Sequence, residues 1–361
     1  MVRLKDICDV DWGDTNLTKQ AYVENGKYLG VSAGGCDGRM DYYDFEAYTP
    51  VISAIGANCG KMFLPEEPFV AIKNTITLKP HKDILGKYIF YALNSNKIPH
   101  RGGGQPFISK TDTEEYMIIC PSLEEQTRIV TIFDKICKII DMRHNQLSKL
   151  DELVKSRFIE MFGDVITNSK SWKQYIFSEI ATSRLGKMLD AKQQTGESSF
   201  PYLANFNVQW FRFDLTSLNQ MDFDEEDRVE FELKEGDLIV CEGGEIGRCA
   251  VWHNEMQPCY FQKALHRVRC NTEVINPNYM AWWFKYNCDH NGFAAIEGAK
   301  ATIAHLPGAK LKLLRVTTPP IELQNEFAAF IEQVDKSKFE IQKSLEKLET
   351  LKKALMQKYF G

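Results

Sequence analysis

The segment from Gly56 to Lys61 comes closest to a phosphate-binding loop, but it does not complete one. It reads Gly-Ala-Asn-Cys-Gly-Lys. A P-loop needs the spacing G-x-x-x-x-G-K-[ST] at the start of a helix, so that backbone N–H groups can surround the phosphates. Here the two glycines are one residue too close, and Met62 follows the lysine. We therefore interpret this segment, and its counterpart Gly243-Gly-Glu-Ile-Gly247, as hairpin turns.

The other catalytic patterns are also incomplete. The tetrapeptide Asn276-Pro-Asn-Tyr279 resembles the Asn-Pro-Pro-Tyr motif of adenine methyltransferases, but it lacks the second proline and no glycine-rich cofactor loop precedes it. The tripeptide Glu232-Leu-Lys234 matches the end of a nuclease triad, without a Pro-Asp pair at a suitable distance. The seven histidines form no H-x-x-x-H pattern, and the ten cysteines form no C-x-x-C pair. The sequence therefore predicts no catalytic residues, no metal site and reduced, idle thiols.

Composition excludes some classes of protein. The chain has 361 residues, of which 44% are hydrophobic, and its formal net charge is −5. That length leaves room for about two domains. A protein that binds DNA alone is usually basic, so this charge favours a subunit whose partners contact the phosphates. No apolar run is long enough to span a bilayer, and the first residues lack the apolar core of a signal peptide. We expect a cytoplasmic protein without a membrane partner.

An internal repeat is the strongest pattern in the sequence. Residues 121–163 align with residues 319–361 without a gap. The identical pairs include Pro121/Pro319, Glu124/Glu322, Gln126/Gln324, Leu147/Leu345, Leu150/Leu348, Leu153/Leu351, Phe162/Phe360 and Gly163/Gly361. Upstream, Val51–Lys61 resembles Leu238–Arg248, and Lys87–Asn94 resembles Asn278–Lys285. One duplicated module explains all three matches.

Each repeat predicts a long helix that begins after a proline and ends at Gly163 or Gly361. Acidic residues in the first turn and apolar residues at spacings of three and four support this prediction. Such a helix is about 57 Å long, and its apolar seam needs a partner. The simplest partner is the other copy; the alternative is that each helix packs only on its own domain. The predicted seam residues are Ile136, Leu147, Leu150, Val154, Val334, Ile341, Leu345, Leu348 and Leu355.

The parts that precede the helices have a different character. Short strand-like runs separated by glycine-rich turns, with one short helix near residues 84–96 and another near 276–288, predict a mixed α+β domain. The predicted organisation is a first domain at 1–120, a central helix at 121–163, a linker at 164–171, a second domain at 172–318 and a C-terminal helix at 319–361.

The order of these elements resembles the specificity subunit of type I restriction–modification systems over nearly the whole chain. The resemblance rests on the repeated order of domain, Pro-x-(Leu/Ile)-Glu-x-Gln, long helix and Phe-Gly. The tracts Gly102–Lys110 and Gly298–Leu306 also resemble the ends of the family's target recognition domains. The resemblance implies two target recognition domains that each read half of a split, asymmetric site in double-stranded DNA, and an antiparallel coiled coil of the two helices. It also implies two methyltransferase subunits and restriction–translocase subunits as partners, which would carry S-adenosylmethionine, ATP and magnesium.

Bases are read by Arg, Lys, Asn, Gln and small hydroxyl side chains. Polar residues on the predicted loops are therefore the candidates: Lys61, Lys73, Asn74, Arg101 and Gln105 in the first half, and Lys187, Gln193, Gln194, Asn207, Gln209, Arg212, Arg248, Lys263 and His266 in the second. The densest cluster is Asn205–Arg212, where amides, an arginine and aromatic rings alternate. For each single residue the alternative is a solvated surface position. For the whole chain the alternative is a coiled-coil scaffold whose duplicated domains bind protein or sugar.

Overall fold

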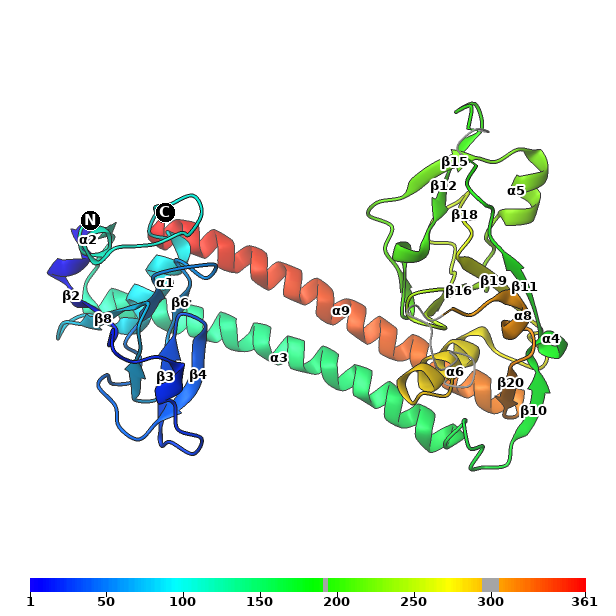
Figure 1. Cartoon of the computed structure of the whole chain (residues 1–361), viewed down its shortest axis with the longest axis horizontal. Coiled ribbons are helices and arrows are strands. Elements are labelled where there is room, and N and C mark those ends of the chain that lie inside the picture. The colour runs from blue at the N-terminus through cyan, green and yellow to red at the C-terminus, as the bar shows by residue number, and fades with distance from the viewer. Residues whose placement is uncertain (191–193, 294–304) are drawn as a thin grey trace. The chain divides into compact units, whose positions relative to one another are not determined.

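The computed structural model describes residues 1–190, 194–293 and 305–361 and separates into two compact units. Unit 1 comprises Met1–Leu147 with Glu340–Gly361, and unit 2 comprises Ser148–Phe339. Two long helices run through both units, namely α3 (Leu123–Phe162), green in Figure 1, and α9 (Ile321–Phe360), orange and red. Each unit therefore holds one α+β module and one stretch of each helix.

The module of unit 1 is built on two small sheets. Its four-stranded antiparallel sheet has the order β2-β8-β5-β6, and its three-stranded sheet has the order β4-β3-β7, with β3 and β7 parallel. The short β1 and β9 form a separate pair. The elements are β1 (Val2–Arg3), η1 (Leu4–Asp6), β2 (Cys8–Trp12), η2 (Lys19–Ala21), β3 (Tyr28–Ser32), β4 (Gly35–Met40), β5 (Val51–Ser53), β6 (Met62–Phe63), β7 (Phe69–Ala71), β8 (Thr75–Pro80), α1 (Gly86–Ser95), α2 (Lys110–Glu114) and β9 (Met117–Ile118).

The module of unit 2 repeats this topology strand for strand. Its four-stranded sheet has the order β11-β19-β16-β17, its three-stranded sheet has the order β15-β12-β18, and β10 pairs with β20. The elements are β10 (Lys173–Ile176), α4 (Phe177–Ile180), β11 (Ala181–Leu185), β12 (Ser199–Leu203), η4 (Asn205–Asn207), β13 (Val208–Gln209), β14 (Arg212–Phe213), β15 (Asn219–Asp222), α5 (Glu225–Phe231), β16 (Leu238–Cys241), β17 (Cys249–Val251), β18 (Tyr260–Phe261), β19 (Leu265–Cys270), α6 (Pro277–Asp289), α8 (Gly308–Leu311) and β20 (Arg315–Thr318). The hairpin β13–β14 and the helix α5 have no equivalent among the elements of unit 1. The α+β class and the duplication inferred from the sequence are thus confirmed.

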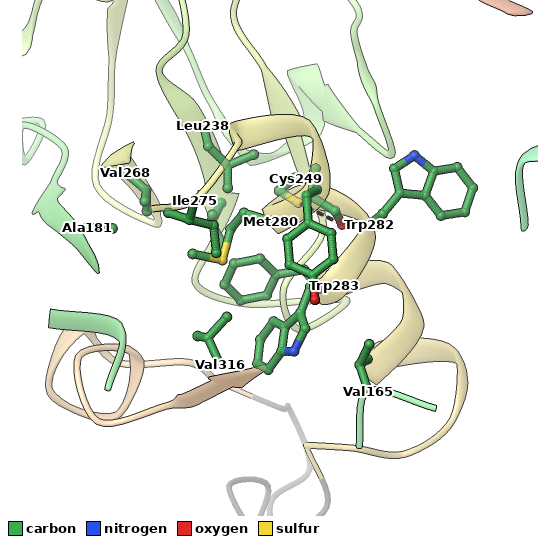
Figure 2. Packing of buried hydrophobic residues seen from close by; sticks show 14 of the residues in the cluster. Val165, Ala181, Leu238, Cys249, Val268, Ile275, Met280, Trp282, Trp283 and Val316 are labelled. Carbon is green, nitrogen blue, oxygen red and sulfur yellow. Dashed lines mark hydrogen bonds between the residues drawn. The ribbon is translucent and has the colours of Figure 1, made fainter. Parts of the chain in front are cut away.

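The amphipathic helix of each module closes its sheet. Along α6, Tyr279, Met280 and Phe284 are fully buried, and Figure 2 shows this helix packing with Leu238 of β16 and Cys249 of β17. In unit 1 the corresponding helix α1 buries Tyr88, Ile89 and Leu93. Removal of such side chains from water is the main favourable contribution to folding, at about 1.5–3 kcal/mol for each large side chain.

Within each unit, α3 and α9 contact each other and run in opposite directions. In unit 2, Phe158 near the end of α3 lies 5.5 Å, centroid to centroid, from Phe327 near the start of α9, and Lys338 binds Asp151 at 2.6 Å. In unit 1, Phe133 near the start of α3 lies 5.7 Å from Phe360 at the end of α9. The two helices therefore pair antiparallel, and each also packs on a module, because these phenylalanines belong to the module cores. The nine seam residues Ile136, Leu147, Leu150, Val154, Val334, Ile341, Leu345, Leu348 and Leu355 are all buried or half-buried.

A buried glutamine fixes the start of each long helix to its module. The Oε1 of Gln126 accepts the N–H of Leu85 at 3.0 Å, and its Nε2 donates to the carbonyl of Pro121 at 3.0 Å. The Oε1 of Gln324 accepts the N–H of Asn276 at 2.9 Å, and its Nε2 donates to the carbonyl of Pro319 at 2.7 Å. Both glutamines are fully buried, so the repeated Pro-x-(Leu/Ile)-Glu-x-Gln motif serves an architectural purpose. The central helix then stops before Gly163, whose positive φ of 71° suits glycine.

Candidate nucleic-acid interface

Three neighbouring turns in unit 1 bring several candidate residues together. They are the β5–β6 turn (54–61), the β7–β8 turn (72–74) and the loop 101–107. The N–H of Ala54 donates to the carbonyl of Asn74 at 2.9 Å, and the N–H of Gly56 donates to that of Pro106 at 2.9 Å. We call this group of turns the first turn platform.

The same platform recurs in unit 2. The N–H of Glu242 in the β16–β17 turn (242–248) donates to the carbonyl of Ala264 in the β18–β19 turn (262–264) at 2.9 Å. Leu306 donates to the carbonyl of Glu242 at 2.6 Å, as Ile108 donates to that of Ala54 at 2.8 Å. We call this group the second turn platform. Its hydrogen bonds match those of the first, as does the bond from Ser53 to the carbonyl of Lys61 with that from Cys241 to the carbonyl of Arg248. Lys61 and Arg248 then occupy equivalent positions, as do Lys73 and Lys263.

The first platform carries polar side chains that are open to solvent. Lys61 is exposed, with its ammonium 5.5 Å from the centre of the Phe63 ring. Lys73 and Gln105 are also exposed, and Arg101 is exposed although it forms an ion pair with Asp112. Asn74 is half-buried, and its φ of 70° lies in the left-handed region. Backbone hydrogen bonds join these turns. The first turn platform therefore carries four exposed candidate side chains and a fifth, Asn74, that is half-buried.

On the second platform the polar side chains are more engaged. The guanidinium of Arg248 donates to the carbonyl of Asn205 at 3.0 Å and to its Oδ1 at 2.5 Å. The ammonium of Lys187 donates to the carbonyl of Asp222 at 2.7 Å and forms an ion pair with Asp227. Lys263, by contrast, is exposed. Arg248 and Lys187 therefore hold the framework together, whereas Lys263 offers its charge to solvent.

The amide of Gln194 also serves the framework. Its Oε1 accepts the N–H of Asp222 at 2.8 Å, and its Nε2 donates to the carbonyl of Asp190 at 3.0 Å. The carboxylate of Asp222 in turn accepts the N–H groups of Thr195 and Gly196, and these hydrogen bonds lower its pKa. Gln194 thus ties its loop to β15.

Two candidates need correction, because their side chains face the interior. Asn207 is 1% exposed, and its Nδ2 donates to the carbonyls of Asp214 and Ser217 at 2.8 and 2.9 Å. His266 is also 1% exposed; its Nε2 lies 3.1 Å from the carbonyl of Leu306, and burial lowers its pKa. Neither group can reach a base edge while these contacts persist. Gln193 lies outside the described residues.

The hairpin β13–β14 is a projection that only the second module has. Its Phe211 ring stacks on Trp282 of α6, with centroids 4.5 Å apart, and the Nε1 of Trp210 donates to Glu245 at 2.7 Å. The Nε2 of Gln209 donates to the carbonyl of Phe206 at 2.8 Å, while Arg212 remains exposed. The alternation of amides and aromatic rings in the sequence pointed to this segment. Nothing in the sequence indicated that Glu245 accepts the hydrogen bond of Trp210, because the two residues are far apart along the chain.

Two buried thiols are unreactive at neutral pH. Burial raises the pKa of the Cys8 and Cys259 thiols to about 12, so neither is a nucleophile at neutral pH. Within the described ranges, no three His, Cys, Asp or Glu side chains gather as a metal-ion site would require. No helix in that same part of the chain is long and apolar enough to cross a membrane.

Comparison with known proteins assigns the two modules. The sequence profile described as "Type I restriction modification DNA specificity domain" matches residues 1–152 and again residues 169–353. The chain belongs to this family.

Individual specificity proteins agree with this membership. A putative type I restriction enzyme specificity subunit of Methanocaldococcus jannaschii is 25% identical over 176 residues, which are 48% of this chain and 41% of that protein. The C-terminal part of a putative type I specificity subunit of Mycoplasma pneumoniae is 32% identical over 110 residues, which are 30% of this chain and 61% of that protein. The chain thus spans less than two thirds of these relatives' length.

Solved structures share the fold of this specificity-domain pair. The crystal structure of a type I restriction–modification S subunit from M. genitalium has a TM-score of 0.66 and 16% identity, covering 100% of this chain and 95% of that one. A chain from a structure described as showing complex assembly and conformational transition of the type I system has a TM-score of 0.59 and 14% identity, covering 99% and 96%. At these identities the likeness establishes the fold of the two modules and their helices.

Proposed function

We propose that this chain is the DNA-sequence-specificity subunit of a type I restriction–modification complex. In this proposal each module reads one half of a split site in double-stranded DNA, and the site is asymmetric because the two modules differ. One observation carries the proposal. The two turn platforms share their backbone hydrogen bonds, yet nearly all of their side chains differ, and only the second module has the hairpin β13–β14. A shared backbone arrangement with different side chains is what two modules that recognise different DNA sequences require.

The long helices give the proposal its spacing element. Each has 40 residues, which corresponds to about 60 Å at a rise of 1.5 Å per residue. We infer that the paired helices set the number of unread base pairs between the half-sites. We also infer that two methyltransferase subunits dock on this chain and that restriction–translocase subunits join them. Partners of that kind would supply most of the phosphate contacts, because this chain has a net charge of −5.

Catalysis in this scheme belongs to the partners. We assign S-adenosylmethionine, ATP and magnesium to the methyltransferase and restriction–translocase subunits, because none of the corresponding motifs is complete in this sequence. A coiled-coil scaffold with protein- or sugar-binding domains is the competing function. Co-purification of a methyltransferase with this chain supports the specificity subunit, and its absence supports the scaffold.

Exchange of residues 1–120 for the first module of another specificity subunit tests the proposal. The methylated sites of a host that carries the hybrid should differ from wild type in one half-site, with the other half-site and the spacer unchanged. Methylome sequencing of hosts with the native gene, the hybrid gene and no gene reads out this result. A change in both half-sites, or methylation that does not depend on the gene, contradicts it.

A further inference from the structure

The β7–β8 and β18–β19 turns are held by equivalent backbone hydrogen bonds. Ile72 donates to the carbonyl of Val31 at 2.9 Å, and Gln262 donates to that of Leu203 at 3.0 Å. On the other side of each turn, Gly13 donates to Thr75 at 2.9 Å, and Gly186 donates to Leu265 at 3.0 Å. The residue before each outgoing strand has a positive φ, 70° at Asn74 and 84° at Ala264. The two turns therefore hold their second residue in the same position on each module.

The side chains of these turns have diverged, with one exception. Between residues 71–80 and the equivalent residues 261–270, the only identical pair is Lys73 and Lys263. Even Asn74, next to Lys73, corresponds to an alanine, Ala264, in the other module. Both lysines are exposed, and within the described residues neither ammonium has a hydrogen bond, an ion pair or an aromatic ring as partner. Packing and stability therefore do not account for this identity.

A lysine that both modules share can have only a few roles if the modules recognise different DNA sequences. If the modules read different half-sites, as the proposed function states, the same group at the same place cannot supply the difference. What two different half-sites have in common is the sugar–phosphate backbone. The lysine ammonium is a compact, hydrated point charge that suits phosphate without preference for sequence.

We propose that Lys73 and Lys263 each contact a backbone phosphate of the DNA and thereby fix the register of their module on the duplex. Base reading is then left to exposed residues that differ between the modules, such as Gln105 in the first and Arg212 in the second. This inference rests on the proposed function and assigns the two lysines a role that does not depend on sequence.

The salt dependence of DNA binding tests the inference. The full chain, assembled with the host methyltransferase subunit, is titrated with one duplex that carries the methylated site and one that lacks it. Each neutralised phosphate contributes about 0.9 to the slope of log K against log salt, which corresponds to about five-fold in affinity near 0.15 M salt. Lys73→Gln and Lys263→Gln should each weaken binding by about this factor on both duplexes and reduce the slope by about 0.9. The methylated sequence should stay the same.

Lys82→Gln provides the matched control. Lys82 is exposed and lies beyond the far end of β8, about 20 Å from Lys73 at 3.3 Å per strand residue. It removes the same charge from the same module and should leave affinity and slope unchanged. Lys73→Arg keeps the charge and should retain the wild-type slope.

Three outcomes separate the possibilities. A changed first half-site in a host with Lys73→Gln would show that this lysine reads a base and would overturn the inference. Unchanged affinity and slope for both glutamine variants would place the lysines off the interface and would also overturn it. Failure of the wild-type complex to bind either duplex would count against the proposed function itself. Weaker binding by the Lys73→Gln and Lys263→Gln variants, with wild-type binding by Lys82→Gln, concerns only the inference about the two lysines.

Discussion

The substitution Gln324→Met tests whether the repeated glutamine fixes the helix to its module. Methionine has nearly the length of glutamine but no strong hydrogen-bonding group. In the folded protein Gln324 is fully buried, accepts the N–H of Asn276 at 2.9 Å and donates to the carbonyls of Pro319 and Val274 at 2.7 and 3.1 Å. The substitution keeps the volume and removes all three hydrogen bonds.

The expected loss of stability follows from the groups left without a partner. A buried donor or acceptor that loses its partner costs about 1–3 kcal/mol. The N–H of Asn276 and the carbonyls of Val274 and Pro319 lose their partners, and the apolar gain of methionine offsets part of this cost. We expect the free energy of unfolding of unit 2 to fall by about 3 kcal/mol.

Guanidinium denaturation of the full chain, followed by tryptophan fluorescence, measures this change. Five of the six tryptophans, from Trp172 to Trp283, lie in unit 2, so the signal reports that unit. Hydrogen exchange adds a local readout, because the amide of Asn276 should exchange faster in the variant. The amide of Leu85, which bonds to Gln126 in unit 1, should keep its rate.

Gln333→Met is the matched control, because Gln333 lies exposed on the same helix. Its effect should stay within about 0.5 kcal/mol. If Gln324→Met destabilises no more than this control, or if the amide of Asn276 keeps its protection, the glutamine does not fix the helix and our interpretation of the repeat motif is wrong.

Four further outcomes are expected. Burial lowers the pKa of His266 from its usual 6.5, so just below pH 6.5 the unfolded chain binds a proton that the folded chain does not bind. The free energy of unfolding should therefore fall as the pH drops below 6.5. In urea unfolding, His266→Gln should reduce this dependence of stability on pH, and an unchanged dependence contradicts the prediction. The Cys8 and Cys259 thiols, with pKa values raised to about 12, should react with a thiol reagent at pH ~8 only after denaturant is added, and rapid labelling of the folded chain would exclude their burial. Arg212→Ala should relax base choice in the second half-site of the methylome alone; relaxation of the first would contradict its assignment. Deletion of seven residues from both α3 and α9 shortens each by about 10 Å, so the unread spacer should shrink by about three base pairs or activity should be lost, and an unchanged spacer refutes the spacing role.

Much of the fold could be predicted because its signals are local or repeated. The helices predicted at 84–96 and 276–288 are α1 and α6, and the long helices begin and end within two residues of the predicted limits. Their apolar periodicity and their prolines act through neighbouring residues, so sequence alone reveals them. The pairing of α3 with α9 also followed, because a helix of that length cannot leave its seam in water.

The candidate interface was harder to predict. Asn207 and Arg212 stand in one polar segment and look alike as base readers. Only the folded chain turns the amide of Asn207 inward, against the carbonyls of Asp214 and Ser217, and leaves Arg212 exposed. His266 looks polar in sequence, but its strand lies in the middle of a sheet and its ring is covered by the segment that contains Leu306.

By itself, the sequence determined the duplication, the class of the modules and the two paired helices. It did so because hydrophobic periodicity and repetition are written along the chain. The tertiary structure decided which polar side chains of the turns face solvent, and that Lys73 and Lys263 hold equivalent positions although little around them is alike. That equivalence depends on hydrogen bonds between strands and turns far apart in sequence, such as those from Gly13 to Thr75 and from Gly186 to Leu265. Such contacts exist only once the sheets have formed.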